Sequence, residues 1–234
     1  MDWLENGWGL SLIVFLPVIG AVVLLAIPKA QEAALKRTAI AFSQVTLAAS
    51  VVMVANFDNS AADTYQFGTD IDTPWIEAIN AHFHIAVDGI SLPLVILSTF
   101  ITVLVIIYSW DHFPEPHNPK LLLALVLILA TGMTGRFVAL DLVLFFLFFE
   151  VVLLPMFFLI AVWGGEDRRY ASLKFFLYTM FGSALMLVSF LAMYFLADGT
   201  VVGDEANTFS MVALSEGATL GIGRTAQLWI FGGM

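Results

Sequence analysis

Six long apolar runs divide this chain, and each is close to the roughly 20 residues that a helix needs to cross a bilayer. The start of a seventh run lies near Leu228. With 60% hydrophobic and only 12% charged residues, the chain has too little polar surface to cover a water-facing core. We therefore predict an all-α polytopic membrane protein with a single membrane domain over residues 1–234. The six complete runs are about Leu10–Ile27, Thr38–Val54, Ile90–Trp110, Leu121–Phe137, Leu140–Val162 and Leu173–Leu196.

The first and last runs differ from the others. Asp2 and Glu5 precede the first run and no Lys or Arg does, so it lacks the positive leader of a signal peptide and we expect an uncleaved helix. The last run stops at Met234 after about two helical turns. So short a helix leaves backbone groups unsatisfied in lipid. We therefore expect the natural sequence to continue beyond Met234.

The basic residues follow alternate apolar runs. Seven of the nine lie after runs one, three and five, and only Arg136 and Arg224 lie on the other side. The positive-inside rule then places the N-terminus outside, together with the acidic loops Asn56–Gly89 and Ala197–Gln227. The chain has no cluster of Lys and Arg that would bind nucleic acid. The seven residues are Lys29, Lys36, Arg37, Lys120, Arg168, Arg169 and Lys174.

The first outer loop alternates polar and apolar residues from Trp75 to Val87, which predicts a short β-hairpin on the outer face. The chain has no cysteine, which excludes Cys-ligated iron–sulfur clusters and thiolate zinc sites. The histidines all lie between the apolar runs, so a bis-histidine haem inside the bundle is not expected. We therefore predict no metal, no cofactor and no redox chemistry on this chain. The histidines are His82, His84, His112 and His117.

Glu150 has the clearest functional signal. It lies within the fifth run, nine residues after Asp141, which places it about 14 Å from the outer end and near the bilayer middle. A charged carboxylate there costs roughly 2.5–3.5 kcal/mol on insertion scales. Burial favours the protonated acid and a nearby cation favours the carboxylate, so a moving partner can load and release a proton. We interpret Glu150 as a proton carrier.

A proline in the same run supports this interpretation. Pro155 has no N–H, so the carbonyl of Val151 loses its helical partner and can hold water beside Glu150. The alternative is a permanently protonated Glu150 that makes one hydrogen bond between helices. Only the proton carrier predicts that a variant at Glu150 assembles and fails to pump.

Three other polar residues have weaker signals. Asp141 begins the fifth helix on the face opposite Glu150 and is interpreted first as an acid favoured by the helix dipole, with a catalytic role as the alternative. Lys174 either extends to the headgroups or tunes Glu150 from the next helix, with Tyr178 continuing a polar stripe. Asp88 is interpreted as turn and helix-start chemistry.

Three motifs occur in order along the chain: VDGISLPL, LDLVLFFLFFEVVLLPMFFLI and GGEDRRYASLKFFLYTMFGSALML. Together they resemble the antiporter-like membrane subunits shared by respiratory complex I and Mrp-type cation/proton antiporters. The resemblance covers most of residues 87–196, and the first 86 residues match in topology alone. The proline after the glutamate and the KFFLYT run are similar to subunit M of bacterial NADH:quinone oxidoreductase, whereas the L-type subunit has Trp where Phe149 stands here.

The resemblance implies that Glu150 matches the family's fifth-helix glutamate, whose partner is a lysine on a broken seventh helix beyond Met234. It implies the N-terminal half of a multi-pass, proton-translocating subunit in the bacterial inner membrane. NADH, FMN, iron–sulfur clusters and quinone are then used on other subunits. Expected partners are those membrane subunits, the lipid bilayer and protons. The alternative is a subunit of a Mrp-type Na⁺/H⁺ antiporter or of a hydrogenase-linked membrane complex.

Overall fold

The computed structural model describes residues 7–61, 63–68, 72–196, 208–216 and 222–234. Within these ranges six helices are long and apolar enough to cross a membrane. This confirms the predicted all-α membrane fold with six spanning helices. The six are α2 (Trp8–Ala26), α3 (Glu32–Ala55), α4 (Ser91–Tyr108), α5 (Pro119–Val138), α6 (Leu142–Trp163) and α7 (Arg168–Leu196).

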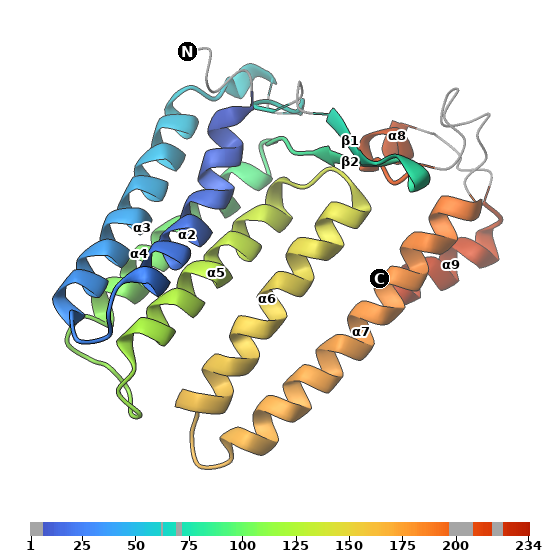
Figure 1. The fold of residues 1–234 in the computed structure, drawn as a ribbon. Helices are drawn as coiled ribbons and strands as arrows, with labels where there is room; N and C mark the ends of the chain where they lie inside the picture. The colour runs from blue at the N-terminus through green and yellow to red at the C-terminus, as the bar shows by residue number, and fades with distance from the viewer. Residues whose placement is uncertain (1–6, 62, 69–71, 197–207, 217–221) are drawn as a thin grey trace.

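Helix α5 is the centre of the bundle. It contacts α2, α3, α4 and α6, and 67% of its most apolar stretch is buried, against 22% for α6 and for α7. Helix α6 packs on α5 and α7 packs on α6, so the bundle thins from a four-helix group towards α7 (Figure 1). The short helix α9 (Arg224–Gly233) packs along α7. Large apolar surfaces on α6 and α7 are therefore left for lipid or for further protein to cover.

Two glycines let α6 approach α5 closely. A methyl group at Gly135 would overlap the ring of Phe148, and one at Gly132 would lie 2.7 Å from Cγ2 of Val152. Small residues at such interfaces allow helix backbones to come together in membranes. Phe148 and Val152 therefore mark the face of α6 that is turned to α5.

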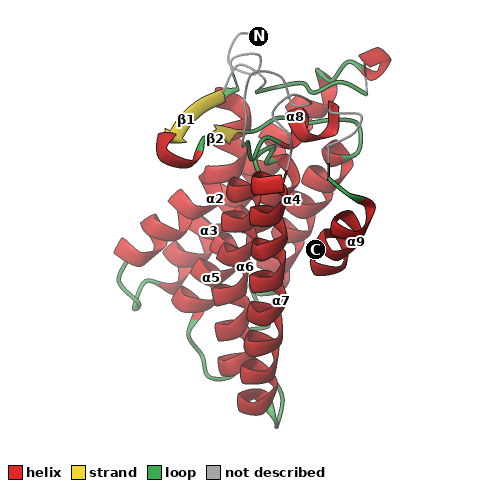
Figure 2. Ribbon diagram, turned by 90° about the vertical axis from the view of Figure 1, so that its right-hand side faces the viewer, coloured by secondary structure: helices red, strands yellow, loops and turns green. Residues whose placement is uncertain are grey.

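The predicted hairpin is present and lies across one end of the bundle (Figure 2). Strand β1 (Asp72–Ile76) pairs antiparallel with β2 (Ala81–His84) through the short helix η2 (Glu77–Ile79). Two backbone hydrogen bonds of 2.9 Å join the end of β2 and the residues after it to the connection between α5 and α6. Leu140 N–H donates to the His84 carbonyl, and Ala86 N–H donates to the Val138 carbonyl. The hairpin is therefore part of the bundle. We call this the hairpin end; it also carries η1 (Asn59–Ala61) and α8 (Met211–Glu216).

Two helices begin earlier than the apolar runs predict. Helix α3 begins at Glu32, six residues early, and α7 begins at Arg168, five residues early. In α3 an ion pair of 2.7 Å joins Glu32 to Lys36 one turn later, a spacing that stabilises a helical turn. Hydropathy detects the lipid-embedded part of a helix, so charged first turns were missed.

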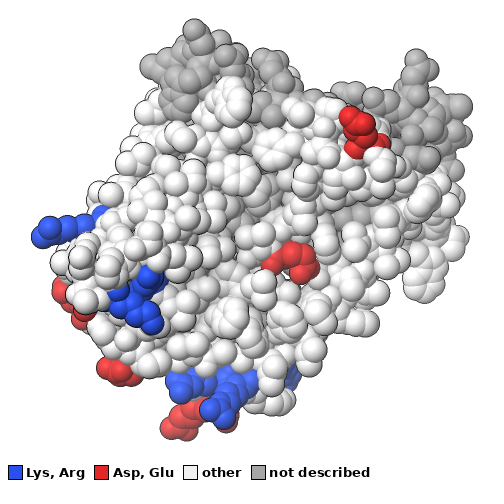
Figure 3. All heavy atoms as spheres, in the orientation of Figure 1, with Lys and Arg blue, Asp and Glu red and all other residues white. Residues whose placement is uncertain are grey.

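The basic residues gather at the other end, called here the basic end. The connections between α2 and α3, α4 and α5, and α6 and α7 all lie there, opposite the hairpin (Figure 1). The space-filling view shows Lys and Arg along this edge, while the broad middle of the face is uncharged apart from acidic atoms near its centre (Figure 3). This confirms the prediction that the connections after spans one, three and five, which carry most of the basic residues, lie on the same side of the bundle. That the hairpin end is the outer side stays a prediction.

Candidate functional site

Glu150 is the ninth residue of the 22-residue helix α6. It therefore lies about 12 Å from the first residue of the helix and about 20 Å from the last. Pro155 lies within α6 without ending it. The depth predicted for Glu150 from the sequence agrees with these helix bounds, so the carboxyl group lies in the middle of a membrane-spanning helix.

Glu150 points away from α5. It is two residues from Phe148, which faces α5, so the two side chains are about 200° apart around the helix. Phe157 lies two turns further on the Glu150 face and packs edge-on against Phe176 of α7, with ring centroids 5.4 Å apart. Leu154, one turn after Glu150, is 55% exposed. Glu150 therefore lies where the α6–α7 interface meets the exposed side of the bundle.

Glu150 is partly buried, and one of its carboxyl oxygens is enclosed. Oε1 is buried and has no hydrogen-bond partner within the described part of the chain. A buried polar atom without a partner costs about 1–3 kcal/mol, and more when it is charged. A hydrogen-bond partner that arrives from outside the described residues removes this cost. The proton-carrying role of Glu150 stays a prediction.

Asp141 is 1% exposed and caps α6, as the helix-dipole argument predicted. Its Oδ1 accepts hydrogen bonds from the N–H groups of Val143 at 2.8 Å and Leu144 at 3.1 Å. Its Oδ2 accepts the N–H of His82, on β2, at 3.1 Å. Burial raises the pKa of Asp141, and these three N–H donors act in the opposite direction. Asp141 thus joins the hairpin to the start of α6, and a catalytic role for it stays a prediction.

The structure does not bring Lys174 to Glu150. Lys174 is exposed near the basic end, with its ammonium group 5.5 Å from the ring centre of Tyr170. It is six residues into α7, whereas Glu150 is thirteen residues from the end of α6, so the two differ in depth by about 10 Å. Tyr178 is 82% exposed and does not extend a polar stripe towards Glu150. The tuning role of Lys174 stays a prediction.

Arg136 was predicted from the sequence only as an outer basic residue, but it lies in the last turn of α5 with a buried Nε. This nitrogen has no hydrogen-bond partner among the described residues, and the guanidinium lies 5.2 Å from the ring of Phe137. Arg136 and Asp88 line one hollow of about 300 Å³ at the hairpin end. Asp88 itself accepts N–H bonds from Ile90 and Ser91, which confirms its helix-start role. The sequence signal that could have identified this hollow was an arginine inside an apolar run.

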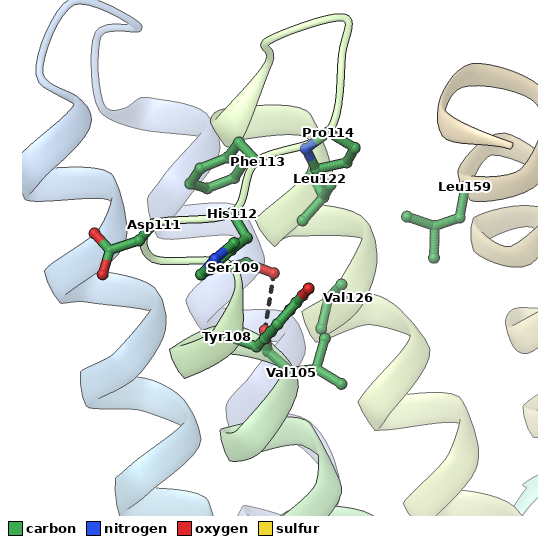
Figure 4. A pocket seen from close by; sticks show the side chains of 10 residues that line it. All are labelled: Val105, Tyr108, Ser109, Asp111, His112, Phe113, Pro114, Leu122, Val126 and Leu159. Carbon is green, nitrogen blue, oxygen red and sulfur yellow. Dashed lines mark hydrogen bonds between the residues drawn. The ribbon is translucent and has the colours of Figure 1, made fainter.

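A groove of about 690 Å³ opens at the basic end between α4, the loop after it, α5 and α6 (Figure 4). The rings of Tyr108 and His112 stack at 4.9 Å, and the Ser109 hydroxyl donates to the Val105 carbonyl at 2.8 Å. Leu159 is the α6 residue of the lining and lies about 14 Å along the helix from Glu150. This groove therefore does not belong to the Glu150 site.

Known protein families match nearly the whole chain. The family profile of "NADH-ubiquinone oxidoreductase chain 4, amino terminus" matches residues 12–134, which is more than half of the chain. The chain belongs to this family. The profile "NADH:quinone oxidoreductase/Mrp antiporter, TM" matches residues 139–233, including α6 and α7. The family resemblance predicted from the sequence motifs is thereby confirmed.

Curated relatives of the family are substantially longer than this chain. NADH-quinone oxidoreductase subunit M of Rhodobacter capsulatus is 43% identical over 195 residues, covering 82% of this chain and 36% of the relative. NADH-ubiquinone oxidoreductase chain 4 of Mycosarcoma maydis is 38% identical over 212 residues, covering 88% of this chain and 41% of the relative. The chain thus spans about two fifths of the length of these two relatives, and the name of the Rhodobacter capsulatus relative agrees with the predicted M type.

Solved structures share the fold. A chain of respiratory complex I from Thermus thermophilus aligns with a TM-score of 0.76 at 22% identity, covering 96% of this chain and 42% of that chain. A chain of the Mrp complex from Dietzia sp. aligns with a TM-score of 0.72 at 20% identity, covering 97% of this chain and 40% of that chain. Both likenesses concern the fold of the helical bundle.

Proposed function

We propose that this chain is the N-terminal part of a proton-translocating membrane subunit of an NADH:quinone oxidoreductase in a bacterial inner membrane. NADH oxidation and quinone reduction take place on other subunits, which carry FMN and iron–sulfur clusters. Membership of the chain 4 family and the identity to subunit M of Rhodobacter capsulatus support this assignment. Within it, the present chain holds and moves protons and performs no electron transfer.

The observation that carries the proposal is the enclosed carboxyl oxygen of Glu150 in the middle of α6. In hydrocarbon the neutral acid is favoured, and a cation that approaches to within about 4–6 Å favours the carboxylate. A change of about 1.4 kcal/mol in this balance alters proton occupancy tenfold. Movement of a cationic partner towards and away from the α6–α7 edge therefore loads and unloads Glu150. We infer that this partner is a lysine beyond Met234.

The test is Glu150→Gln in the full-length subunit within its assembled complex. Gln keeps the size and hydrogen-bonding capacity of the side chain but cannot release a proton. We expect normal assembly, and a loss of NADH-driven proton pumping in membrane vesicles. Glu166→Gln is the matched control, because Glu166 is an exposed acid in the α6–α7 connection. Wild-type pumping by a fully assembled Glu150→Gln complex would reject the proposal.

Lys174 is tested in the same vesicles. If it tunes Glu150, Lys174→Met slows pumping and shifts the pH optimum of pumping, whereas Lys174→Arg does neither. If Lys174 only extends to the headgroups, both variants pump at the wild-type rate across the pH range.

A second function is favoured by the shared family profile, whose description includes Mrp antiporters. A subunit of a Mrp-type Na⁺/H⁺ antiporter, or of a hydrogenase-linked membrane complex, uses the same carboxyl group without NADH. The two functions separate in vesicles that are supplied with a sodium gradient and no NADH. Proton movement that depends on Na⁺ and on Glu150 under these conditions favours the antiporter, and movement that requires NADH favours the oxidoreductase.

A further inference from the structure

A cluster of buried hydroxyl groups lies between the four helices α2 to α5, away from Glu150. Its residues come from α3, α4 and α5, and each is at most 9% exposed. They enclose a small cavity together with Pro17 of α2 and Ala130 of α5, and α6 contributes nothing to its lining. The hydroxyl residues are Ser43, Thr46, Thr99, Thr102 and Thr134.

Four of these hydroxyls have already used their hydrogen atom. Each donates to a carbonyl three or four residues earlier in its own helix, at distances of 2.8 to 3.0 Å. A hydroxyl oxygen that donates its proton still has lone pairs that accept hydrogen bonds. The wall of the cavity therefore offers acceptors and requires a donor. The four are Ser43, Thr46, Thr99 and Thr102.

Thr134 supplies the complementary group. It is 1% exposed, and its hydroxyl has no hydrogen-bond partner among the described residues, so it is able to donate into the cavity it lines. Leaving such a group unsatisfied costs about 1–3 kcal/mol. A molecule that accepts from Thr134 and donates to one or two of the four acceptors removes that cost.

The backbone of α2 also lacks a helical hydrogen bond beside this cavity. Pro17, which lines the cavity, has no N–H to continue the helical ladder. The next N–H, that of Val18, donates to the hydroxyl of Thr131 on α5 at 3.0 Å. Polar contacts between α2 and α5 thus continue beside the cavity.

The size and chemistry of the cavity define its ligand. It leaves about 10 Å³ for the centre of a water molecule, close to the roughly 10–15 Å³ that one ordered water requires. A cation is disfavoured, because no carboxylate lines the cavity and an uncompensated buried charge is very costly. We infer that this cavity is a binding site for a single structural water, which donates one hydrogen to a hydroxyl of α3 and the other to a hydroxyl of α4, and accepts from Thr134.

The direct test is a cryo-EM map of the assembled complex at a resolution that shows ordered waters. We expect density within about 3.2 Å of Thr134 Oγ1. Thr134→Val, which replaces the hydroxyl by a methyl group of similar size, should abolish the density, and Thr134→Ser should keep it. An empty cavity in the wild-type map overturns the inference, whether or not the variants assemble.

Thermal unfolding of the complex gives a second readout with opposite signs. If water is bound, Thr134→Val removes the hydrogen bond that the water accepts from residue 134, and the unfolding midpoint falls by a few degrees. If the cavity is dry, the same variant removes an unsatisfied hydroxyl, and the midpoint stays constant or rises. Ser50→Ala is the matched control: Ser50 is fully buried in α3 and donates to the Thr46 carbonyl, but it does not line the cavity. This control should leave the water density in place.

Discussion

Replacing Asp141 separates the two roles of its carboxyl oxygens: one caps α6, and the other contacts the hairpin. Asp141→Asn keeps an oxygen that caps α6, because Asn is as good an N-cap as Asp. It removes the second oxygen, which accepts the His82 N–H from β2. Loss of one hydrogen bond to a charged group costs about 1.5 kcal/mol. Asp141→Ala loses the cap as well, which adds about 1 kcal/mol, so the total is about 2.5 kcal/mol.

The two costs appear at different places in the chain, so amide hydrogen exchange by mass spectrometry is the appropriate assay. Local opening free energies set the exchange rates of protected amides. For Asp141→Asn we expect about tenfold faster exchange in Ala81–His84 and wild-type exchange at Val143 and Leu144. For Asp141→Ala we expect the same change in β2 and about fivefold faster exchange at the start of α6.

A matched control comes from the other capping aspartate. Asp88 accepts N–H bonds from Ile90 and Ser91 at the start of α4, and none from the hairpin is seen in the described structure. Asp88→Ala should therefore speed exchange at the start of α4 and leave β2 unchanged. If Asp141→Asn changed β2 and α6 equally, or changed neither, the role of Asp141 in joining the hairpin to α6 would be refuted.

Three further predictions follow from the packing and charge of the bundle. Gly135→Ala should lower stability by about 1–3 kcal/mol in thermal unfolding, because its methyl group meets the ring of Phe148, whereas Gly182→Ala, with nothing within 4 Å, should be neutral or slightly stabilising. Lys120→Met should lower the unfolding midpoint and speed exchange in the α2–α3 connection, because its ammonium group donates to the carbonyls of Leu25 and Ile27 at 2.7 and 2.8 Å; Lys120→Arg should restore most of the loss, and equal effects of both variants would contradict this role. Burial raises the pKa of Asp141 above its ordinary value of 3.8, so the folded state holds the carboxyl proton more tightly than the unfolded state does. The stabilisation of the folded state by this proton is complete below pH 3.8 and declines as pH rises through the raised pKa. The difference in unfolding midpoint between wild type and Asp141→Asn should accordingly fall as pH increases over this range, and a difference that rises would contradict the assigned direction.

Local pattern alone determined the number of spans and the place of Glu150. Each span is a property of about 20 neighbouring residues, because lipid requires every crossing segment to be apolar and helical. An acid in the middle of such a segment is visible without knowing any neighbour in space. The hairpin was likewise predictable, since period-two alternation is a local signal.

Tertiary structure decided what each polar group touches. Whether Glu150 faces α5 or α7 depends on the glycines of another helix, Gly132 and Gly135, which bring α5 against Phe148. Lys174 was within range of Glu150 by sequence, but it lies only six residues into α7, which begins at Arg168, and so differs from Glu150 in depth by about 10 Å.

The longest-range contacts were invisible to pattern. Asp141 receives a hydrogen bond from a residue 59 positions away, and the hydroxyl cavity is assembled from four helices. Serine and threonine inside an apolar run give no indication of where they point, because each hydroxyl is satisfied by its own helix until packing encloses it. The apolar runs of the sequence therefore specify how often the chain crosses the membrane, and helix packing specifies which buried polar groups come into contact.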